Sequence, residues 1–179
     1  MSELVATLAD AGVRTLVDVR RYPGSRRNPQ FNRPALESAV AEAGITYRHA
    51  VELGGRLSGE PGEERFPCLR VPAFRSYAAR MGAPAWQDAL AAALAEPAPC
   101  FLCAETDPRR CHRSLIAELL HARREEVVHL IRPGTAEVHI PSRYATAHNG
   151  HLYLCHEPVD REGSADRFRS IQQKLFQGD

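Results

Sequence analysis

The residues best suited to chemistry lie between Cys103 and Arg113, where the sequence reads Cys-Ala-Glu-Thr-Asp-Pro-Arg-Arg-Cys-His-Arg. This stretch, called the reactive segment below, carries two thiols, two carboxylates, one imidazole and three guanidinium groups. The apolar run 99–102 before it predicts a short strand, and helical spacing of apolar residues in 114–123 predicts a helix after it. At strand-to-helix turns of an open α/β sheet, helix N-termini present free backbone N–H groups to ligands. We therefore expect the functional site at this turn.

One interpretation of the reactive segment is a cysteine nucleophile. Cys103 and Arg109 match the Cys-x5-Arg spacing of cysteine phosphatases, in which loop N–H groups and an arginine hold phosphate while the helix N-terminus lowers the thiol pKa. The charges of Glu105 and Asp107 would repel a phosphate, and Pro108 removes one N–H donor. These three residues argue against a phosphatase loop, but Cys103 stays a candidate catalytic residue.

A second interpretation is a zinc site. Cys103, Cys111 and His112 could be joined by Cys155 or His156 as soft ligands. The segment has no Cys-x2-Cys pair, however, and adjacent residues on a helix point about 100° apart, which makes joint ligation by Cys111 and His112 awkward. The sequence therefore assigns no cofactor and no metal ligand, and zinc remains an alternative.

A third interpretation makes carboxylates and arginines the working groups. Asp18 and Glu105 follow two predicted strands, so a parallel sheet would place both at one crevice, lined by Tyr47 and by three phosphate anchors, Arg20, Arg26 and Arg113. Such a site suits an enzyme, a hydrolase or transferase, that acts on a nucleic-acid or nucleotide-like phosphorylated substrate, for example by cleaving an N-glycosidic bond. We take this as the leading hypothesis. A thiol protein using Cys103 and Cys111, or a nucleic-acid-binding module without catalysis, is the alternative.

A purely structural interpretation is also open. Asp18 could pair with Arg113 in a buried salt bridge, Cys103 could be a core residue, and Cys111 and His112 could cap the following helix. Trp86 is expected in the core, and Cys68 and Cys100 are expected to have no role.

Hydrophobic periodicity and turn residues predict alternating helices and strands along most of the chain. We expect helices over 2–11, 34–43, 73–80, 85–95 and 114–123, and strands over 15–19, 45–48, 99–102 and 127–131. The alternation predicts an α/β fold with a mostly parallel sheet and helices on both faces. Residues 52–70 lack periodicity and are expected to form a long loop near the site.

The pattern changes after Gly134. Segments 137–140 and 151–155 flank a loop ending in Asn149-Gly150, which is a hairpin signal, and 165–177 predicts a closing helix. We therefore expect a single domain over 1–179, with an α/β core in 1–132 and a hairpin-and-helix extension in 133–179.

Composition bounds the class of protein. The 179 residues are 44% hydrophobic and 25% charged, as in one globular domain. No run approaches the roughly 18 apolar residues that cross a bilayer, and no secretion signal opens the chain, so a cytoplasmic protein without a membrane partner is expected. Three of the five cysteines, Cys100, Cys103 and Cys111, lie close together in sequence, which favours free thiols over disulfides.

Positive charge is concentrated near the N-terminus. Between Arg14 and Arg33 the chain has six arginines and a single acid, Asp18. Tyr22 and Phe31 lie among these arginines, and this composition can hold phosphates and stack a base. The segment therefore predicts nucleic acid or a nucleotide as partner. The sequence sets no oligomeric state.

Several motifs together resemble the family called domain of unknown function 488. They are Leu16-Val17-Asp18-Val19-Arg20, Pro23-Gly24-Ser25-Arg26, Phe31, Tyr47, Leu53-Gly54-Gly55, Cys103-Ala104-Glu105, Pro108 and Cys111-His112-Arg113. They occur in the family's order over about residues 3–132. The resemblance implies a compact α/β domain and implies little about activity.

The predictions converge on one set of residues. The candidate catalytic residues are Asp18, Tyr47, Cys103 and Glu105. The candidate substrate-binding residues are Arg20, Ser25, Arg26, Phe31, Gly54, Gly55, Cys111, His112 and Arg113.

Overall fold

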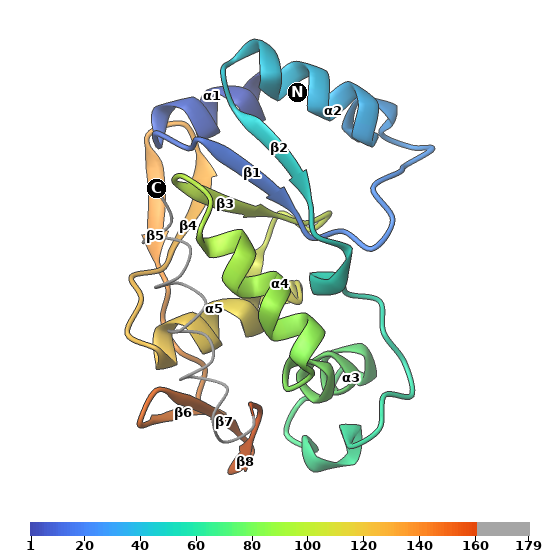
Figure 1. The fold of residues 1–179 in the computed structure, drawn as a ribbon, viewed down its shortest axis with the longest axis vertical. Helices are drawn as coiled ribbons and strands as arrows, with labels where there is room; N and C mark the ends of the chain where they lie inside the picture. The colour runs from blue at the N-terminus through green and yellow to red at the C-terminus, as the bar shows by residue number, and fades with distance from the viewer. Residues whose placement is uncertain (161–179) are drawn as a thin grey trace.

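A three-stranded parallel sheet organises the fold in the computed structural model, which describes residues 1–160 (Figure 1). Its strands are β1 (Thr15–Asp18), β2 (Thr46–His49) and β3 (Pro99–Leu102), in the order β2-β1-β3. Asp18 at the end of β1 lies opposite His49 of β2 and Leu102 of β3. The three carboxyl ends therefore meet at one edge of the sheet, as the sequence predicted for an α/β fold.

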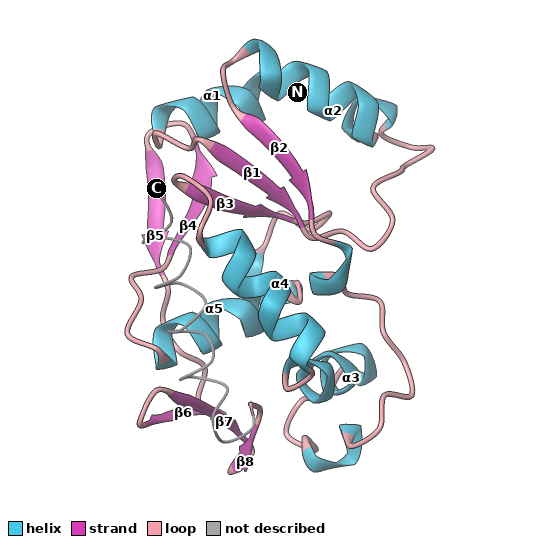
Figure 2. Cartoon of the chain, viewed as in Figure 1, coloured by secondary structure: helices cyan, strands magenta, loops and turns pink. Residues whose placement is uncertain are grey.

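Helices cover both faces of this sheet, which confirms the prediction (Figure 2). On one face, Leu16 packs in a core cluster with side chains of α1 (Ser2–Asp10) and α2 (Arg33–Glu42). On the other, Val17 belongs to a larger cluster with α4 (Pro84–Leu94) and α5 (Arg113–Ala122). Because successive side chains of a strand alternate between faces, a strand covered on both sides must be a continuous buried run, and every residue of β1 is buried.

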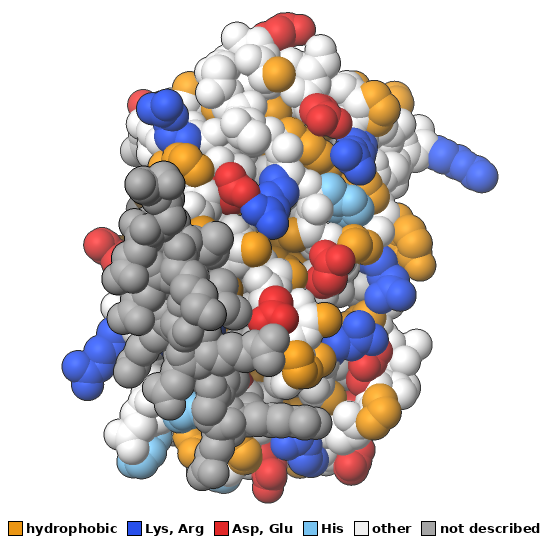
Figure 3. Space-filling view, in the orientation of Figure 1, with side chains coloured by type: hydrophobic (Ala, Val, Ile, Leu, Met, Phe, Trp, Pro, Cys, Tyr) orange, Lys and Arg blue, Asp and Glu red, His pale blue; other side chains and the backbone are white. Residues whose placement is uncertain are grey.

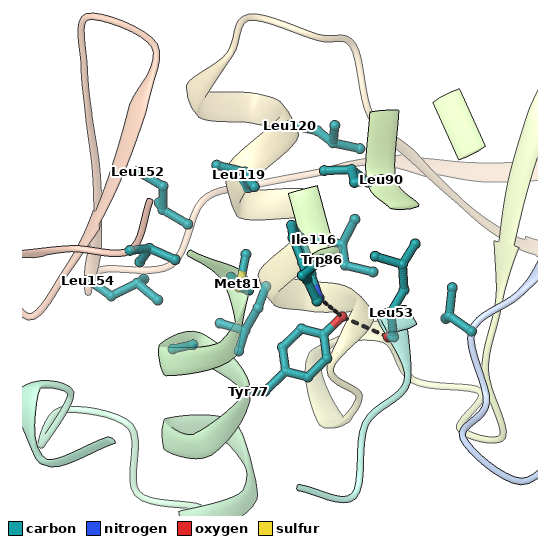
Figure 4. Close-up of a cluster of buried hydrophobic side chains, with 14 of the residues drawn as sticks. Leu53, Tyr77, Met81, Trp86, Leu90, Ile116, Leu119, Leu120, Leu152 and Leu154 are labelled. Carbon is teal, nitrogen blue, oxygen red and sulfur yellow. Dashed lines mark hydrogen bonds between the residues drawn. The ribbon is translucent and has the colours of Figure 1, made fainter. Parts of the chain in front are cut away.

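The larger core cluster is anchored by aromatic residues (Figure 4). Trp86 is 1% exposed, as predicted for a core residue, and its indole Nε1 donates to the Tyr77 hydroxyl at 3.3 Å. Tyr77, on α3 (Pro72–Met81), in turn donates to the carbonyl of Leu53 at 2.8 Å. This chain of hydrogen bonds satisfies the buried polar atoms and fixes Leu53, just before two glycines that approach the candidate site.

The segment predicted as a long loop contains two short 3-10 helices, η2 (Val51–Leu53) and η3 (Glu63–Arg65), and is otherwise irregular up to α3. It ends near a disulfide between Cys68 and Cys155. The expectation of free thiols is therefore wrong for these two cysteines, and Cys68, expected to have no role, forms a cross-link. Their Cα atoms lie 5.6 Å apart although 87 residues separate them, a proximity that only the tertiary fold creates.

The strand predicted over 127–131 exists as β4 (Val128–Arg132), but it does not join the parallel sheet. It pairs antiparallel with β5 (Thr135–Val138) in a separate ribbon. The turn between them is too short for the crossover that a parallel partner requires, and Gly134 adopts a φ of 71° within it.

The predicted hairpin forms, but its first strand is a different segment from the one expected. Its strands are β6 (Ala145–His148) and β7 (His151–Leu154), joined at Asn149-Gly150 as expected, while the segment expected as its first strand overlaps β5 instead. A short strand β8 (Glu157–Pro158) follows on β7. The helix predicted over 165–177 lies outside the described residues. No helix within 1–160 has the length and apolar character needed to cross a bilayer.

Candidate functional site

The reactive segment lies at the carboxyl edge of the parallel sheet, as its strand-to-helix position predicted. Cys103 directly follows β3, and α5 begins ten residues later at Arg113. Between them, the 3-10 helix η4 (Pro108–Arg110) is capped by Asp107, whose carboxylate accepts from the Arg109 N–H at 3.0 Å. Asp107, one of the two acids that would repel a phosphate, therefore stabilises the turn that leads to Cys111.

Cys103, Cys111 and His112, the thiol triad, come together at this edge. The Sγ atoms of Cys103 and Cys111 are 2.7 Å apart, and Nδ1 of His112 lies 3.8 Å from the first and 3.7 Å from the second. Nε2 of His112 is 3.1 Å from the carbonyl oxygen of Val19, the residue after β1. A carbonyl oxygen only accepts, so Nε2 must carry a proton, and in the neutral ring Nδ1 presents a lone pair to both sulfurs.

The two thiols of the triad differ in acidity. The hydrogen bond from Cys111 is the main cause that lowers the pKa of Cys103 to about 4. Partial burial opposes this shift, whereas the positive charge that His112 carries when its ring is protonated and a backbone hydrogen bond at Glu105 add to it. The same hydrogen bond between the two thiols, together with burial, raises the pKa of Cys111. Burial raises the pKa of the neighbouring thiol of Cys100 to about 11, although Arg113 opposes it. Cys103 is therefore the more acidic thiol of the pair, and Cys111 is the donor of the hydrogen bond between them.

Two glycines allow close approaches of the chain beside the triad, and Gly55 is the one that contacts it. A Cβ on residue 55 would lie 2.6 Å from Nδ1 of His112, and a Cβ on residue 54 would lie 2.8 Å from the carbonyl oxygen of Val51 and 3.0 Å from Cα of Arg21. Both glycines are buried. Gly54 and Gly55, predicted to bind substrate, thus serve close packing in this structure.

Asp18 and Tyr47 form a second network beside the triad. The Asp18 carboxylate has no exposed surface, accepts from Nε of Arg20 at 2.9 Å and accepts from the Tyr47 hydroxyl at 2.7 Å. Arg20 also donates to the carbonyl of Phe31 at 2.8 Å, which ties the arginine-rich loop to β1. The buried ion pair that Asp18 could form with Arg113 therefore forms with Arg20 instead. The guanidinium of Arg20, two residues along the chain, lies against the carboxylate, whereas Arg113 donates to backbone carbonyls.

Electrostatics within this network keep its members in fixed states. Burial, followed by the hydrogen bond to Asp18, raises the pKa of Tyr47. For Arg20, burial acts in the lowering direction, but the hydrogen bond and charge of Asp18 outweigh it and raise the pKa. Asp18 and Arg20 are therefore buried within a hydrogen-bonded cluster, and Tyr47, which is partly exposed, lies at its border.

The other predicted residues have separate surroundings. Arg113 donates to the carbonyls of Phe101 at 3.2 Å and Glu105 at 2.7 Å, so it supports the reactive segment from behind. The Glu105 side chain itself is exposed, as is Arg26. Ser25 accepts from the Asn28 N–H at 3.0 Å within the arginine-rich loop. Local sequence patterns could not show that these side chains have different partners.

A chain of three titratable side chains lies away from this edge and has no sequence signal. Nε2 of His129 on β4 is 3.0 Å from Nδ1 of His139, and Nε2 of His139 is 3.5 Å from the Glu118 carboxylate on α5. A cavity of about 480 Å³ beside it is lined by Cys100, Arg113 and His129 among mostly apolar residues, and by neither Cys103 nor Cys111. These groups meet because His139, just after β5, lies between His129 of β4 and Glu118 of α5.

Within the described residues, the thiol triad is the group of side chains whose ligand atoms lie close enough to hold a metal ion, all within 4.8 Å of one another. Cys155, considered above as a fourth ligand, is instead bonded to Cys68.

Comparison with known proteins supports the resemblance found in the sequence. A family model described as "Domain of unknown function DUF488" matches residues 1–120, which include the sheet, the thiol triad and most of α5. No curated protein and no solved structure matches the chain.

Proposed function

Since the chain belongs to the DUF488 family, whose description assigns no activity, we propose a function from its geometry: a thiol-dependent enzyme in which Cys103 is the nucleophile and Cys111 the resolving thiol. The observation that carries the proposal is the 2.7 Å separation of the two sulfurs beside the His112 lone pair. A disulfide has an S–S length of about 2.05 Å, so the pair needs to close by only about 0.7 Å to form one.

The reaction that fits is exchange with a substrate disulfide. The Cys103 thiolate attacks one substrate sulfur, a Cys103–substrate disulfide forms, and the other substrate sulfur leaves as a thiolate. Cys111 then attacks Sγ of Cys103, its proton passes to Nδ1 of His112, and the second substrate thiolate leaves. The substrate disulfide is reduced by two electrons and the Cys103–Cys111 dithiol is oxidised, so a second dithiol must reduce the protein for another turnover.

Three features of the site support this assignment. Cys103 is partly exposed while Cys111 is buried, so substrate meets the nucleophile first. The triad lies at the N-terminus of α5, where the helix dipole favours a thiolate. Val19 and Gly55 hold His112 in one orientation, with its unprotonated nitrogen toward both sulfurs.

Reaction with oxidised glutathione in the presence of a chelator tests the proposal. We expect the wild-type chain to form a Cys103–Cys111 disulfide, and Cys111→Ser to stop at a mixed disulfide of Cys103 with glutathione, both read by peptide mass spectrometry. Cys103 should react at least about tenfold faster than Cys100, because Cys100 is held as a neutral thiol. Cys100→Ser, which changes a free cysteine outside the triad, is the matched control and should behave as wild type. Modification of Cys100 at the same rate, or no reaction at Cys103, would refute the proposal.

A metal-dependent hydrolase is the second candidate, and it is favoured by the ligand spacing of the same triad. In that case Cys103 would be a metal ligand rather than a nucleophile, and removal of the metal by a chelator would abolish the hydrolase activity.

The nucleic-acid or nucleotide partner predicted from the sequence remains a proposal about the substrate or a bound ligand. It is supported by Arg26 and Arg27, which are exposed and have no salt bridge to any residue within 1–160. We also propose hydrolysis of such a substrate through Glu105, including N-glycosidic cleavage. The exposure of Glu105 supports this role, whereas Asp18 is buried.

A mobility-shift titration of DNA and RNA at two salt concentrations tests this partner. The double variant Arg26→Ala/Arg27→Ala should weaken binding and reduce the salt dependence by about one to two counterions, because each lost phosphate contact releases about one fewer ion. Arg14→Ala is the matched control, because Arg14 is exposed at the opposite edge of the sheet. Equal binding by all three proteins would exclude this loop as the contact.

A further inference from the structure

The thiol triad has a second chemistry that goes beyond disulfide exchange. We infer that, in the reduced protein, Cys103, Cys111 and His112 hold a zinc-class divalent cation and leave a fourth position open. Two thiolates and one imidazole form a soft donor set, and three protein ligands are the number found in catalytic zinc sites, where water or substrate fills the remaining position.

The nitrogen-to-sulfur distances fit this geometry without rearrangement. In a tetrahedral site with Zn–N of about 2.0–2.1 Å and Zn–S of about 2.3 Å, the nitrogen and each sulfur lie roughly 3.6 Å apart. Nδ1 of His112 lies 3.8 Å from Sγ of Cys103 and 3.7 Å from Sγ of Cys111. The difficulty of joint ligation by adjacent residues does not arise, because Cys111 precedes the helix and has an extended backbone, with φ −126° and ψ 148°.

The orientation of His112 is a separate observation in favour of a metal. Metal-ligating histidines usually donate their second ring N–H to a carbonyl or carboxylate, which fixes the tautomer. Nε2 of His112 has such an acceptor in the Val19 carbonyl at 3.1 Å, so Nδ1 is free to bind a cation. His112 is 9% exposed, and its Nδ1 faces the two sulfurs rather than water.

Only the sulfur pair must move. Two thiolates on one tetrahedral zinc ion lie about 3.8 Å apart, so the observed 2.7 Å must open by about 1 Å. The observed distance thus lies between that of a disulfide and that of a metal-bound pair. Cys103 follows β3 in a segment without helix or strand, and can supply this movement.

Metal binding and disulfide formation exclude each other, because both use the same two sulfurs. The reduced triad therefore binds the cation. Oxidation to the Cys103–Cys111 disulfide passes two electrons to the oxidant and releases the cation into solution. This coupling, unlike the metal site itself, rests on the proposed function.

Cobalt and zinc are the probes for the experiment. We expect the reduced chain to bind about one Zn²⁺, measured by elemental mass spectrometry after dialysis, and Co²⁺ to give thiolate charge-transfer absorption in the near ultraviolet. Cys103→Ser, Cys111→Ser and His112→Gln should each weaken Zn²⁺ binding at least about tenfold. Cys100→Ser is the matched control and should bind as wild type. Treatment of the wild type with diamide should release the metal, which tests the same sulfurs without a substitution.

The outcomes separate this inference from the proposed function. Absence of Zn²⁺ and Co²⁺ binding to the folded, reduced wild-type chain overturns the inference, as does binding that the three triad variants leave unchanged. If Cys103 and Cys111 still form a disulfide with oxidised glutathione in that case, only the metal inference fails. If zinc binds through the triad but Cys103 does not react with oxidised glutathione after chelation, the metal site stands and the proposed exchange reaction fails.

Discussion

At the scale of single residues, the candidate site depends on close approach rather than on unusual residue types. His112 reaches both thiols because its ring passes directly over Gly55, and it is held from behind by the Val19 carbonyl. The Tyr77 ring lies 4.9 Å from the His112 ring between centroids and fills the remaining side. These three contacts restrict the orientation of the imidazole, and a fixed orientation is what a reactive site requires of its side chains.

Gly55→Ala tests this packing. A methyl group 2.6 Å from Nδ1 must displace His112 or the 54–57 backbone, so we expect a loss of about 1–3 kcal/mol in the free energy of unfolding and slower formation of the Cys103–Cys111 disulfide. The measurements are urea unfolding and the rate of reaction with oxidised glutathione. Gly24→Ala is the control, because its new Cβ would meet only an Asn32 oxygen at 4.0 Å. Equal stability and reactivity of the two variants would contradict the packing argument.

At the scale of elements, a chain of titratable side chains links β4 to α5 through His129, His139 and Glu118. Burial, followed by the neighbouring charges of His139 and Arg113, lowers the pKa of His129, and Glu137 opposes them only in part. His129 therefore binds a proton at lower pH in the folded state than in the unfolded chain, where its pKa has the ordinary value of about 6.5.

The sign of the pH effect follows from this difference. Above about pH 6.5 neither the folded nor the unfolded state binds the proton, and the free energy of unfolding is unaffected. At lower pH only the unfolded state binds it, so the free energy of unfolding decreases until the pH reaches the pKa of His129 in the folded state. Urea unfolding between pH 7.5 and 5 should show this decline, and His129→Gln should reduce its slope. His148→Gln, on an exposed position of the β6–β7 hairpin, is the control and should leave the slope near that of wild type. A slope that His129→Gln does not change would assign the effect to other groups.

At the scale of the whole molecule, the segment before α3 and the C-terminal hairpin are held together by the Cys68–Cys155 disulfide. On the face shown in Figure 3, acidic, basic and apolar side chains of the described residues are interspersed. A cross-link closing 87 residues restricts the unfolded chain strongly, and this is the main source of disulfide stabilisation in the chain-entropy model.

Removal of this cross-link by Cys68→Ser/Cys155→Ser should lower the free energy of unfolding by about 2–4 kcal/mol. Chemical reduction of the wild type should give the same loss, measured by guanidinium unfolding with and without reductant. Because neither cysteine belongs to the thiol triad, the reaction of Cys103 with oxidised glutathione should persist in the folded double variant. An unchanged unfolding midpoint after reduction would show that the bond does not stabilise the chain.

Local patterns in the sequence predicted most of the helices and strands and the position of the candidate site in the fold. Apolar runs predicted β1 and β3, helical spacing predicted α4 and α5, and the reactive segment between β3 and α5 pointed to the carboxyl edge of the sheet. These predictions succeed because burial and helix periodicity act over neighbouring residues, and strand-to-helix turns of parallel sheets share one edge.

Only the tertiary structure decided which side chains meet. It paired Asp18 with Arg20 and Tyr47 instead of Arg113, brought Cys68 to Cys155, and turned β4 away from the parallel sheet toward β5. It also placed the two triad sulfurs within reach of one His112 nitrogen. These contacts depend on the packing of residues distant in the chain and on the direction of each side chain, and neither quantity is encoded in local spacing.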